Sequence, residues 1–338
     1  MATVYVREQG AVVRRQGERI VVTKDGREIM DLPLIHLDQL ALMGNVQLTT
    51  PAVALLVQNG VDVVFFSRYG KFRGRIVHTG SKFARLRHAQ LRKMSDKQAA
   101  LAIARAVVAG KLSNQRTILG RQIRDMPFSP HRSRVEQAMR EIGELTLKAK
   151  AAPSLDVLRG WEGRAGACYF GALRMLLAEE WGFRGRAYYP PPDPINALLS
   201  FGYSLLLKDV LAAVQLVGLD PYLGFFHAIE YGRPSLALDM MEEFRPTIVD
   251  SLVLYLANNE ILTRADFVWT RERKRPVRLS DKALELFIHR YEERINVRVF
   301  HPGVRQKTTY RRCFELQVRQ LAKVILGKKA SYRPMTIK

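Results

Sequence analysis

The first 80 residues alternate short apolar runs with turn residues, a pattern typical of β-strands. Asp25-Gly26 and two further glycines separate β-branched or apolar runs that predict strands at 4–6, 11–13, 19–22, 29–32, 62–66 and 74–77. Thr50-Pro51 opens a short helical stretch that continues through Leu56. The pattern therefore predicts a small β-rich domain with one helix.

From about residue 83 onward, apolar residues recur at helical spacing instead. Ser95-Asp96-Lys97-Gln98 has the spacing of a capping box, with Ser95 as the N-cap of a helix. Further periodic stretches predict helices at 134–150, 154–180, 194–217, 238–258, 280–295 and 309–326. Four prolines between 190 and 194 mark the sharpest break in this part of the chain. The expected fold class is α+β, with an N-terminal β-rich domain and a larger all-α C-terminal domain.

Composition narrows the class of protein. The 338 residues are 47% hydrophobic, which excludes a disordered basic tail protein, and the length suggests two domains. Two cysteines exclude a disulfide framework or a Cys-rich zinc site and fit a reducing, cytoplasmic environment. No run of about 20 uninterrupted apolar residues and no signal-peptide pattern occur, so no membrane association is expected.

Positive charge is large and unevenly distributed. The chain has 54 Lys+Arg against 32 Asp+Glu, a net charge of +22. Residues 81–150 hold 16 basic and 5 acidic residues, net +11, and residues 271–338 hold 19 and 6, net +13. A solvated basic face would explain one such segment. Two basic segments on either side of a central part that contains carboxylates favour a binding surface for nucleic-acid phosphates.

A glycine-rich segment, Gly160-Trp161-Glu162-Gly163-Arg164-Ala165-Gly166, lies within the predicted helix 154–180. Each glycine costs a helix about 1 kcal/mol relative to alanine. Close packing of a neighbouring helix or the approach of a ligand to the backbone could compensate. From this segment alone, a surface glutamate on a tightly packed helix is the favoured interpretation of Glu162.

A histidine and several acids form a second candidate group. His227 follows an apolar run, and Asp239 and Glu242 share a face if their segment is helical, with Ser235 as a possible cap. An imidazole with carboxylates suits Mg²⁺ or Mn²⁺. A lone histidine is more often structural, but this group makes a metal site equally plausible. Such an ion stabilises the charge that develops on phosphate oxygens, so the site and the net charge together point to cutting or joining nucleic acid.

Helical spacing also ranks the neighbouring acids. Successive helical residues diverge by about 100°, so Glu242 and Glu243 face differently, whereas Asp239 lies on the Glu242 side. We therefore expect Asp239 to assist the site and Glu243 to lie outside it.

The segment from Lys111 to Arg121 is polar for the middle of a helix, and a solvated face is the slightly favoured interpretation. The other histidines have no spacing typical of metal ligands, neither cysteine lies in a nucleophile pattern, and the chain has no phosphate-binding glycine loop.

Four motifs in order resemble the CRISPR-associated Cas1 family, the endonuclease/integrase of spacer acquisition in antiviral defence. They are Lys111-x-x-Asn114-Gln115-Arg116, the glycine–glutamate–glycine helix at 160–165, Asp-Pro-x-Asn at 193–196, and His227 with the acidic segment 233–246. Together with the β-then-helical layout, the likeness extends over nearly the whole chain. Gly166 stands where alanine is common in the family, and Glu243 follows Glu242 where the second acid varies.

The resemblance implies an N-terminal β domain at 1–80 that mediates homodimerisation, a linker at 81–92, and a helical catalytic and DNA-binding domain at 93–338. It implies a Mg²⁺- or Mn²⁺-dependent enzyme that works with the small partner Cas2 on double-stranded and branched DNA. Such enzymes join the 3′-hydroxyl ends of captured DNA to the repeat by transesterification. The implied catalytic and metal-binding residues are Glu162, His227 and Glu242, with Asp239 as an auxiliary. Candidate DNA-binding residues in the motifs are Lys111, Arg116, Arg164, Arg233 and Arg245.

One alternative of a different class stays open at this point. A non-catalytic, basic nucleic-acid-binding protein would have the same net charge, and its acids would be structural. Four ordered motifs would then be a coincidence.

Overall fold

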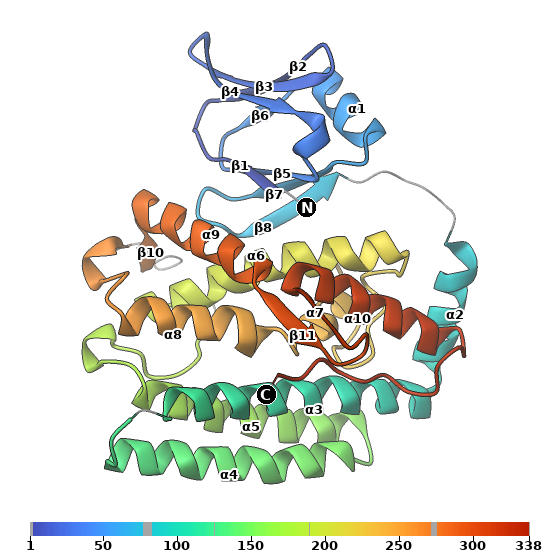
Figure 1. The fold of residues 1–338 in the computed structure, drawn as a ribbon, viewed down its shortest axis with the longest axis vertical. Coiled ribbons are helices and arrows are strands. Elements are labelled where there is room, and N and C mark those ends of the chain that lie inside the picture. The colour runs from blue at the N-terminus through green and yellow to red at the C-terminus, as the bar shows by residue number, and fades with distance from the viewer. Residues whose placement is uncertain (1–2, 77–82, 125, 189, 272–275, 338) are drawn as a thin grey trace. The chain divides into compact units, whose positions relative to one another are not determined.

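The computed structural model describes residues 3–76, 83–124, 126–188, 190–271 and 276–337. The chain divides into two compact units, Met1–Lys82 and Phe83–Lys338. The first unit is β-rich with one helix and the second is mainly helical (Figure 1), so the predicted α+β class is confirmed.

Two four-stranded sheets and one helix, α1 (Thr50–Gln58), build the first unit. One sheet has the order β1-β5-β7-β8, with β1 (Thr3–Val6), β5 (Gln39–Met43) and β7 (Asp62–Phe66) parallel and β8 (Phe72–Ile76) antiparallel to β7. The other has the order β4-β3-β2-β6, formed by Arg27–Pro33, Arg19–Lys24, Val12–Gln16 and Gln47–Leu48. Apolar residues from α1 and from strands of both sheets form one core.

The strand pattern located most of this unit but missed two strands, the two-residue β6 and the longer β5. Strands occupy the predicted runs, although Val77 lies outside the described residues, and α1 begins at the predicted Thr50. Strand β5 was not predicted. All five of its residues are buried, so it lacks the alternation of apolar and polar residues that marks a half-exposed strand.

Helices α2 to α10 dominate the second unit. Their bounds are α2 (Ala84–Ser95), α3 (Lys97–Gln122), α4 (Pro130–Lys150), α5 (Leu155–Met175), α6 (Pro194–Val217), α7 (Ser235–Met241), α8 (Ser251–Asn258), α9 (Asp281–Asn296) and α10 (Tyr310–Ile325). Helix α2 occupies most of the segment 81–92 that was expected to be a linker, and residues 81–82 lie outside the described residues.

The all-α prediction for the second unit needs a correction. Two antiparallel strand pairs occur among the helices: β9 (Phe267–Trp269) with β10 (Val277–Leu279), and β11 (Arg298–His301) with β12 (Gln306–Thr309). Each strand has only three or four residues, too few to show a period in the sequence.

Two predicted caps also differ from the structure. Asp96, rather than Ser95, caps α3, because its carboxylate accepts hydrogen bonds from the Gln98 and Ala99 amides. Ser95 ends α2, and its hydroxyl donates to the Leu91 carbonyl. Ser235 is the first residue of α7 and donates to the Ala228 carbonyl instead of capping the helix.

The predicted helix at 238–258 is not continuous. It is divided into α7, a π-helical turn at Arg245–Asp250, and α8. Pro246 lies in the turn and has no backbone N–H, which explains the local change of hydrogen bonding.

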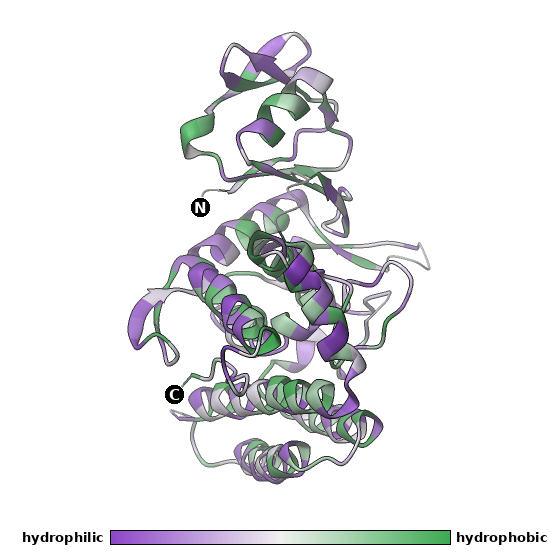
Figure 2. Ribbon diagram, turned by 90° about the vertical axis from the view of Figure 1, so that its right-hand side faces the viewer, coloured by the Kyte–Doolittle hydropathy of each residue, from purple (hydrophilic) through white to green (hydrophobic). Residues whose placement is uncertain are grey.

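Helix α6 forms the centre of the second unit. Among the described residues it is the one helix long and apolar enough to cross a membrane, but 78% of its most apolar window is buried inside the protein. It also carries the buried charges of Lys208 and Asp209. These features are typical of the core helix of a globular unit. The surrounding helices are banded in hydrophilic and hydrophobic residues, as amphipathic helices are (Figure 2).

The C-terminal segment 331–337 has no regular secondary structure, yet it is docked tightly. The Asn114 amide donates to the carbonyls of Met335, 2.9 Å, and Glu243, 2.7 Å, and its oxygen accepts from the Ile337 amide, 3.0 Å. A Cβ on Gly110 would collide with the Pro334 ring, so only glycine allows this approach. Asn114 of α3 thereby bonds both to Glu243, the residue after Glu242, and to the C-terminal segment.

We predict that Asn114→Ala lowers the free energy of unfolding by about 2–4 kcal/mol, because it leaves several buried backbone groups without partners. Urea titration measures this quantity. Asn259→Ala is the matched control, because Asn259 is exposed and bonds only to its own helix. Equal, small effects for both variants would show that Asn114 does not hold the C-terminal segment.

Candidate active site

Two carboxylates from different helices meet at one lysine. Glu162 lies in the middle of α5 and Glu242 directly follows α7, and each has a carboxylate oxygen 2.5 Å from Lys111 Nζ on α3. The side chains of Lys111 and Glu242 are only 12% and 2% exposed. The expected solvated face at 111–121 is therefore wrong, since Asn114 and Gln115 are buried as well.

Burial and charge oppose each other at this cluster. Burial alone would make ionisation of Glu242 unfavourable, but Arg245, Lys111 and His227 more than offset it and lower its pKa to about 2. Burial likewise opposes the charge of Lys111, and Glu242 and Glu162 outweigh it, so the pKa of the lysine is raised. Glu242 and Lys111 are thus ionised at neutral pH, and Arg245 Nη2 lies 3.2 Å from Glu242 Oε1.

His227 is oriented by Asp239. Its Nδ1 lies 2.7 Å from Asp239 Oδ1, and a carboxylate partner requires the proton on Nδ1. In the neutral imidazole the lone pair is then on the other nitrogen, Nε2, which lies 3.8 Å from Glu242 Oε1. Asp239 also accepts hydrogen bonds from the backbone amides of Phe225, Phe226 and His227. Its oxygens therefore hold the backbone of this loop and the ring of His227.

Glu243 faces away from the cluster, as the helical spacing predicted. Its carboxylate accepts hydrogen bonds from Gln317 Nε2, Tyr332 Oη and the Met335 amide. Burial raises the pKa of Glu243 to about 7, although these hydrogen bonds act in the opposite direction. Glu242 therefore belongs to the cluster, and Glu243 belongs to the anchor of the C-terminal segment.

The glycines of α5 do not serve close helix packing. A Cβ added to Gly160, Gly163 or Gly166 would have no described atom of another element within 4 Å. Glu162 is partly buried, with a side chain 22% exposed, and it is paired with Lys111. The interpretation as a surface glutamate on a tightly packed helix is therefore wrong. An open, glycine-lined helix face beside Glu162 leaves room for a ligand to approach the backbone.

The residues around Lys111 suit a divalent cation in their chemistry. Two carboxylates and one imidazole nitrogen are donors that Mn²⁺ and Mg²⁺ accept. Glu242 Oε2 is buried and receives no hydrogen bond of good geometry, although Lys111 Nζ is close. As the described side chains stand, no three of them are placed to coordinate one ion. The ammonium of Lys111 lies at the point where the carboxylates meet, and its flexible stem allows it to move.

The candidate DNA-binding residues lie in three different environments. Lys111 and Arg245 are in the cluster itself. Arg164 forms an ion pair of 2.8 Å with Glu141, and Arg233 forms one of 2.8 Å with Glu230. The side chains of these two arginines are 62% and 34% exposed. Arg116 lines a depression of about 690 Å³ between α3 and α4, together with Arg121, Arg124 and Lys150.

Behind the cluster lies a buried network that the sequence patterns did not indicate. Asp250 accepts hydrogen bonds from the hydroxyls of Tyr203, 2.6 Å, and Tyr169, 2.9 Å. The Arg245 guanidinium stacks over the Tyr203 ring, 4.8 Å from its centroid, and so connects Asp250 to Glu242. Tyr169 comes from α5 and Tyr203 from α6, whereas Arg245 and Asp250 are the two ends of the π-helical turn, so only the fold brings the network together.

Asp250 gives a prediction about stability and pH. Burial raises its pKa from 3.8 to about 6, although the tyrosines act in the opposite direction. Its favourable contribution is complete below pH 3.8 and is lost as the pH rises through 6. Relative to Asp250→Asn, the native protein should therefore lose roughly 2 kcal/mol of unfolding free energy between pH 4 and pH 8. Urea titrations across this range measure the difference, and a constant difference would contradict the assignment.

Comparison with known proteins identifies the family to which the chain is similar. The model of the family described as "CRISPR associated protein Cas1" matches residues 4–293. A curated relative from Thermus thermophilus, "CRISPR-associated endonuclease Cas1 3", is 36% identical over 340 residues, covering 100% of this chain and 98% of the relative. Another from Moorella thermoacetica, "CRISPR-associated endonuclease Cas1 1", is 36% identical and covers 98% and 97% of the two chains.

Solved structures agree in fold. A CAS1 protein from Thermotoga maritima has a TM-score of 0.80 at 24% identity, with both chains covered completely. A casposase bound to an integration product has a TM-score of 0.84 at 24% identity, covering 98% of this chain and 93% of the casposase. The full-length identity to curated relatives and the family match confirm the resemblance seen in the motifs: the chain belongs to the Cas1 family.

Proposed function

We propose that this protein is a metal-dependent DNA endonuclease and integrase that inserts captured DNA fragments into a CRISPR array. The observation that carries the proposal is the meeting of Glu162 and Glu242 at Lys111, with His227 Nε2 facing Glu242. Curated relatives of the same length are named endonucleases, which supports a catalytic role for this cluster over a purely structural one.

Glu162, His227 and Glu242 would hold a divalent ion, Mg²⁺ or Mn²⁺. When bound, such an ion stabilises negative charge on phosphate oxygens and increases the reactivity of a nearby hydroxyl or water. Asp239 holds the His227 ring with Nε2 available, and Arg245 keeps Glu242 ionised. The low pKa of Glu242 matters because only an ionised carboxylate is a good ligand for a hard cation.

The reaction exchanges one phosphodiester for another. In joining, the 3′-hydroxyl oxygen of the captured fragment forms a bond to a phosphorus of the repeat. The bond from that phosphorus to the 3′-oxygen of the repeat strand breaks, and this oxygen leaves with a proton. In nicking, water replaces the attacking hydroxyl. No nucleotide cofactor is needed, because the number of phosphodiester bonds is conserved in the transfer.

Basic side chains near the cluster are suited to hold the DNA. With an ion held between Glu162 and Glu242, Lys111 would be displaced from these carboxylates, and its ammonium would be available to contact a phosphate. The open glycine face of α5 allows a phosphate backbone to approach the helix beside Glu162. Arg116 and the other basic residues of the α3–α4 depression offer further phosphate contacts.

We predict that Glu162→Gln, His227→Ala and Glu242→Gln each abolish Mn²⁺-dependent nicking and joining of branched DNA and leave DNA binding in EDTA near native. Loss of at least about 10³-fold in rate is expected for a variant that no longer holds the ion. Asp239→Asn should reduce the rate less, by about 10–100-fold, because it acts through His227.

Glu243→Gln is the matched control, because it alters a neighbouring carboxyl that faces away from the cluster. Its nicking rate should stay within a few-fold of the native rate. Activity that survives in Glu242→Gln but is lost in Glu243→Gln would overturn the assignment. DNA binding by the native protein without metal-dependent nicking would favour the non-catalytic alternative.

We further propose that the protein acts as a homodimer with Cas2, and that residues 1–80 carry the dimer contact. In the first unit, β4 is an edge strand of its sheet and exposes Ile29, and Ile35 just beyond it is 86% exposed. A second copy would cover such apolar side chains. A solved structure of similar fold is a "Cas6-RT-Cas1--Cas2 complex", in which this chain matches 36% of the larger chain, and it supports the choice of partner.

For the dimer, we predict that Ile35→Asp shifts the protein from dimer to monomer in light scattering. Removal of residues 1–80 should have the same effect, since the second unit is compact by itself. Phe128→Asp is the control, because Phe128 in the other unit is an apolar side chain of nearly the same exposure, 84%. A dimer that persists without residues 1–80 would place the contact elsewhere.

A further inference from the structure

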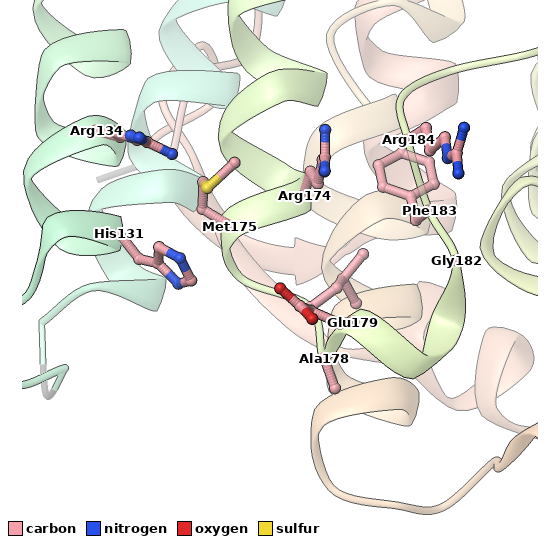
Figure 3. Close-up of a pocket in the computed structure, with 10 residues that line it drawn as sticks. His131, Arg134, Arg174, Met175, Ala178, Glu179, Gly182, Phe183 and Arg184 are labelled. Atoms are coloured by element: carbon pink, nitrogen blue, oxygen red, sulfur yellow. The ribbon is translucent and has the colours of Figure 1, made fainter.

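A second concentration of positive charge lies apart from the cluster at Lys111. His131 and Arg134 extend from α4, Arg174 comes from the last turn of α5, and Arg184 follows the turn after it (Figure 3). Together they line a pocket of about 370 Å³. The pocket contains no residue of the candidate active site, and neither the family motifs nor the cluster accounts for it.

The arginines of this pocket are unpaired within the described part of the chain. No described residue forms a hydrogen bond or ion pair with the guanidinium groups of Arg134, Arg174 and Arg184. By contrast, Arg132 of α4 is paired with Glu136, and Arg164 of α5 is paired with Glu141. Glu179 is the one acidic residue of the lining, and it lies beyond ion-pair distance of these arginines.

Three unpaired cations at one pocket repel one another, and this cost is recovered when an anion binds. Arginine is especially suited to phosphate, because its planar fork donates two parallel hydrogen bonds to phosphate oxygens. The exposed positions of all three arginines fit a ligand that arrives as part of a long surface-bound chain.

Part of the pocket wall is also held rigidly before any ligand binds. Trp181 and Phe183 are buried, 3% and 5% exposed, and the Trp181 ring packs edge-on against Phe267. Gly182 has φ 64°, a conformation that glycine adopts without strain, and it lets the chain turn between these two anchors. Arg184 follows directly, so its backbone position is fixed, which lowers the entropy cost of binding.

We propose that this pocket binds a phosphate of the DNA backbone at a distance from the reacting phosphate. The proposal rests on the proposed function, because it identifies DNA as the ligand. Arg174 is twelve residues beyond Glu162 on α5, about 18 Å along the helix axis, or roughly five base-pair steps. The pocket would therefore position the substrate and take no part in the chemistry.

The test measures binding of a labelled DNA duplex in EDTA as a function of salt, so that no metal-dependent reaction is involved. The variant is Arg134→Gln combined with Arg174→Gln. Each lost phosphate contact should reduce the slope of log K against log salt by about 0.9 and weaken binding about fivefold at 0.15 M salt. For both contacts we expect a slope change of about 1.8 and binding about 30-fold weaker.

The matched control is Arg85→Gln combined with Arg140→Gln, which removes the same charge from exposed positions outside the pocket. All four side chains are exposed, so unfolding midpoints should stay near native in both double variants. Equal affinity and equal salt slope in the two double variants would overturn the proposal. The proposal would also be overturned if the pocket variant lost binding to poly-glutamate but bound DNA like its control. That result would show that the pocket binds an acidic protein.

The same measurement separates this proposal from the proposed function. If the native protein shows no metal-dependent nicking but the pocket variant loses DNA binding as expected, the proposed chemistry is wrong and the phosphate pocket stands. If nicking occurs and the pocket variant binds DNA like its control, the pocket assignment alone is wrong.

Discussion

The ion pairs of Lys111 with Glu162 and Glu242 are the interaction on which the candidate active site depends. They bring α3, α5 and the end of α7 to one point, and they place two carboxylates where their mutual repulsion would otherwise be severe. The buried ammonium of Lys111, together with Arg245, lowers the pKa of Glu242 and keeps its carboxylate ionised. The same arrangement prepares the site for a divalent ion, because a cation already lies between the two acids.

Supporting residues around this point have separate tasks. Asp239 orients His227, Arg245 neutralises Glu242, and Asp250 with its two tyrosines lies behind Arg245. Glu243 turns in the other direction and anchors the C-terminal segment. Adjacent residues of one short segment therefore serve chemistry and architecture, because successive helical positions point to different sides.

How much the sequence revealed depended on whether a feature was local. The strands of the first unit and helix α6 follow from apolar patterns within a few residues, and the opposite directions of Glu242 and Glu243 follow from helical geometry alone. Strand β5 was missed because burial on both faces removes the period. The environments of Lys111, Asn114 and Asp250 could not be predicted, because their partners are distant in sequence. The motifs identified the family, and only the fold showed that Lys111 joins the acids.

A crystal structure of the native protein soaked with Mn²⁺ would test the central claim most directly. Anomalous scattering locates the ion without reference to activity. The account predicts a Mn²⁺ peak bonded to Glu162, His227 Nε2 and Glu242, with the Lys111 ammonium displaced from between the carboxylates. A bound Mn²⁺ elsewhere, with Lys111 still joining Glu162 and Glu242, would contradict it.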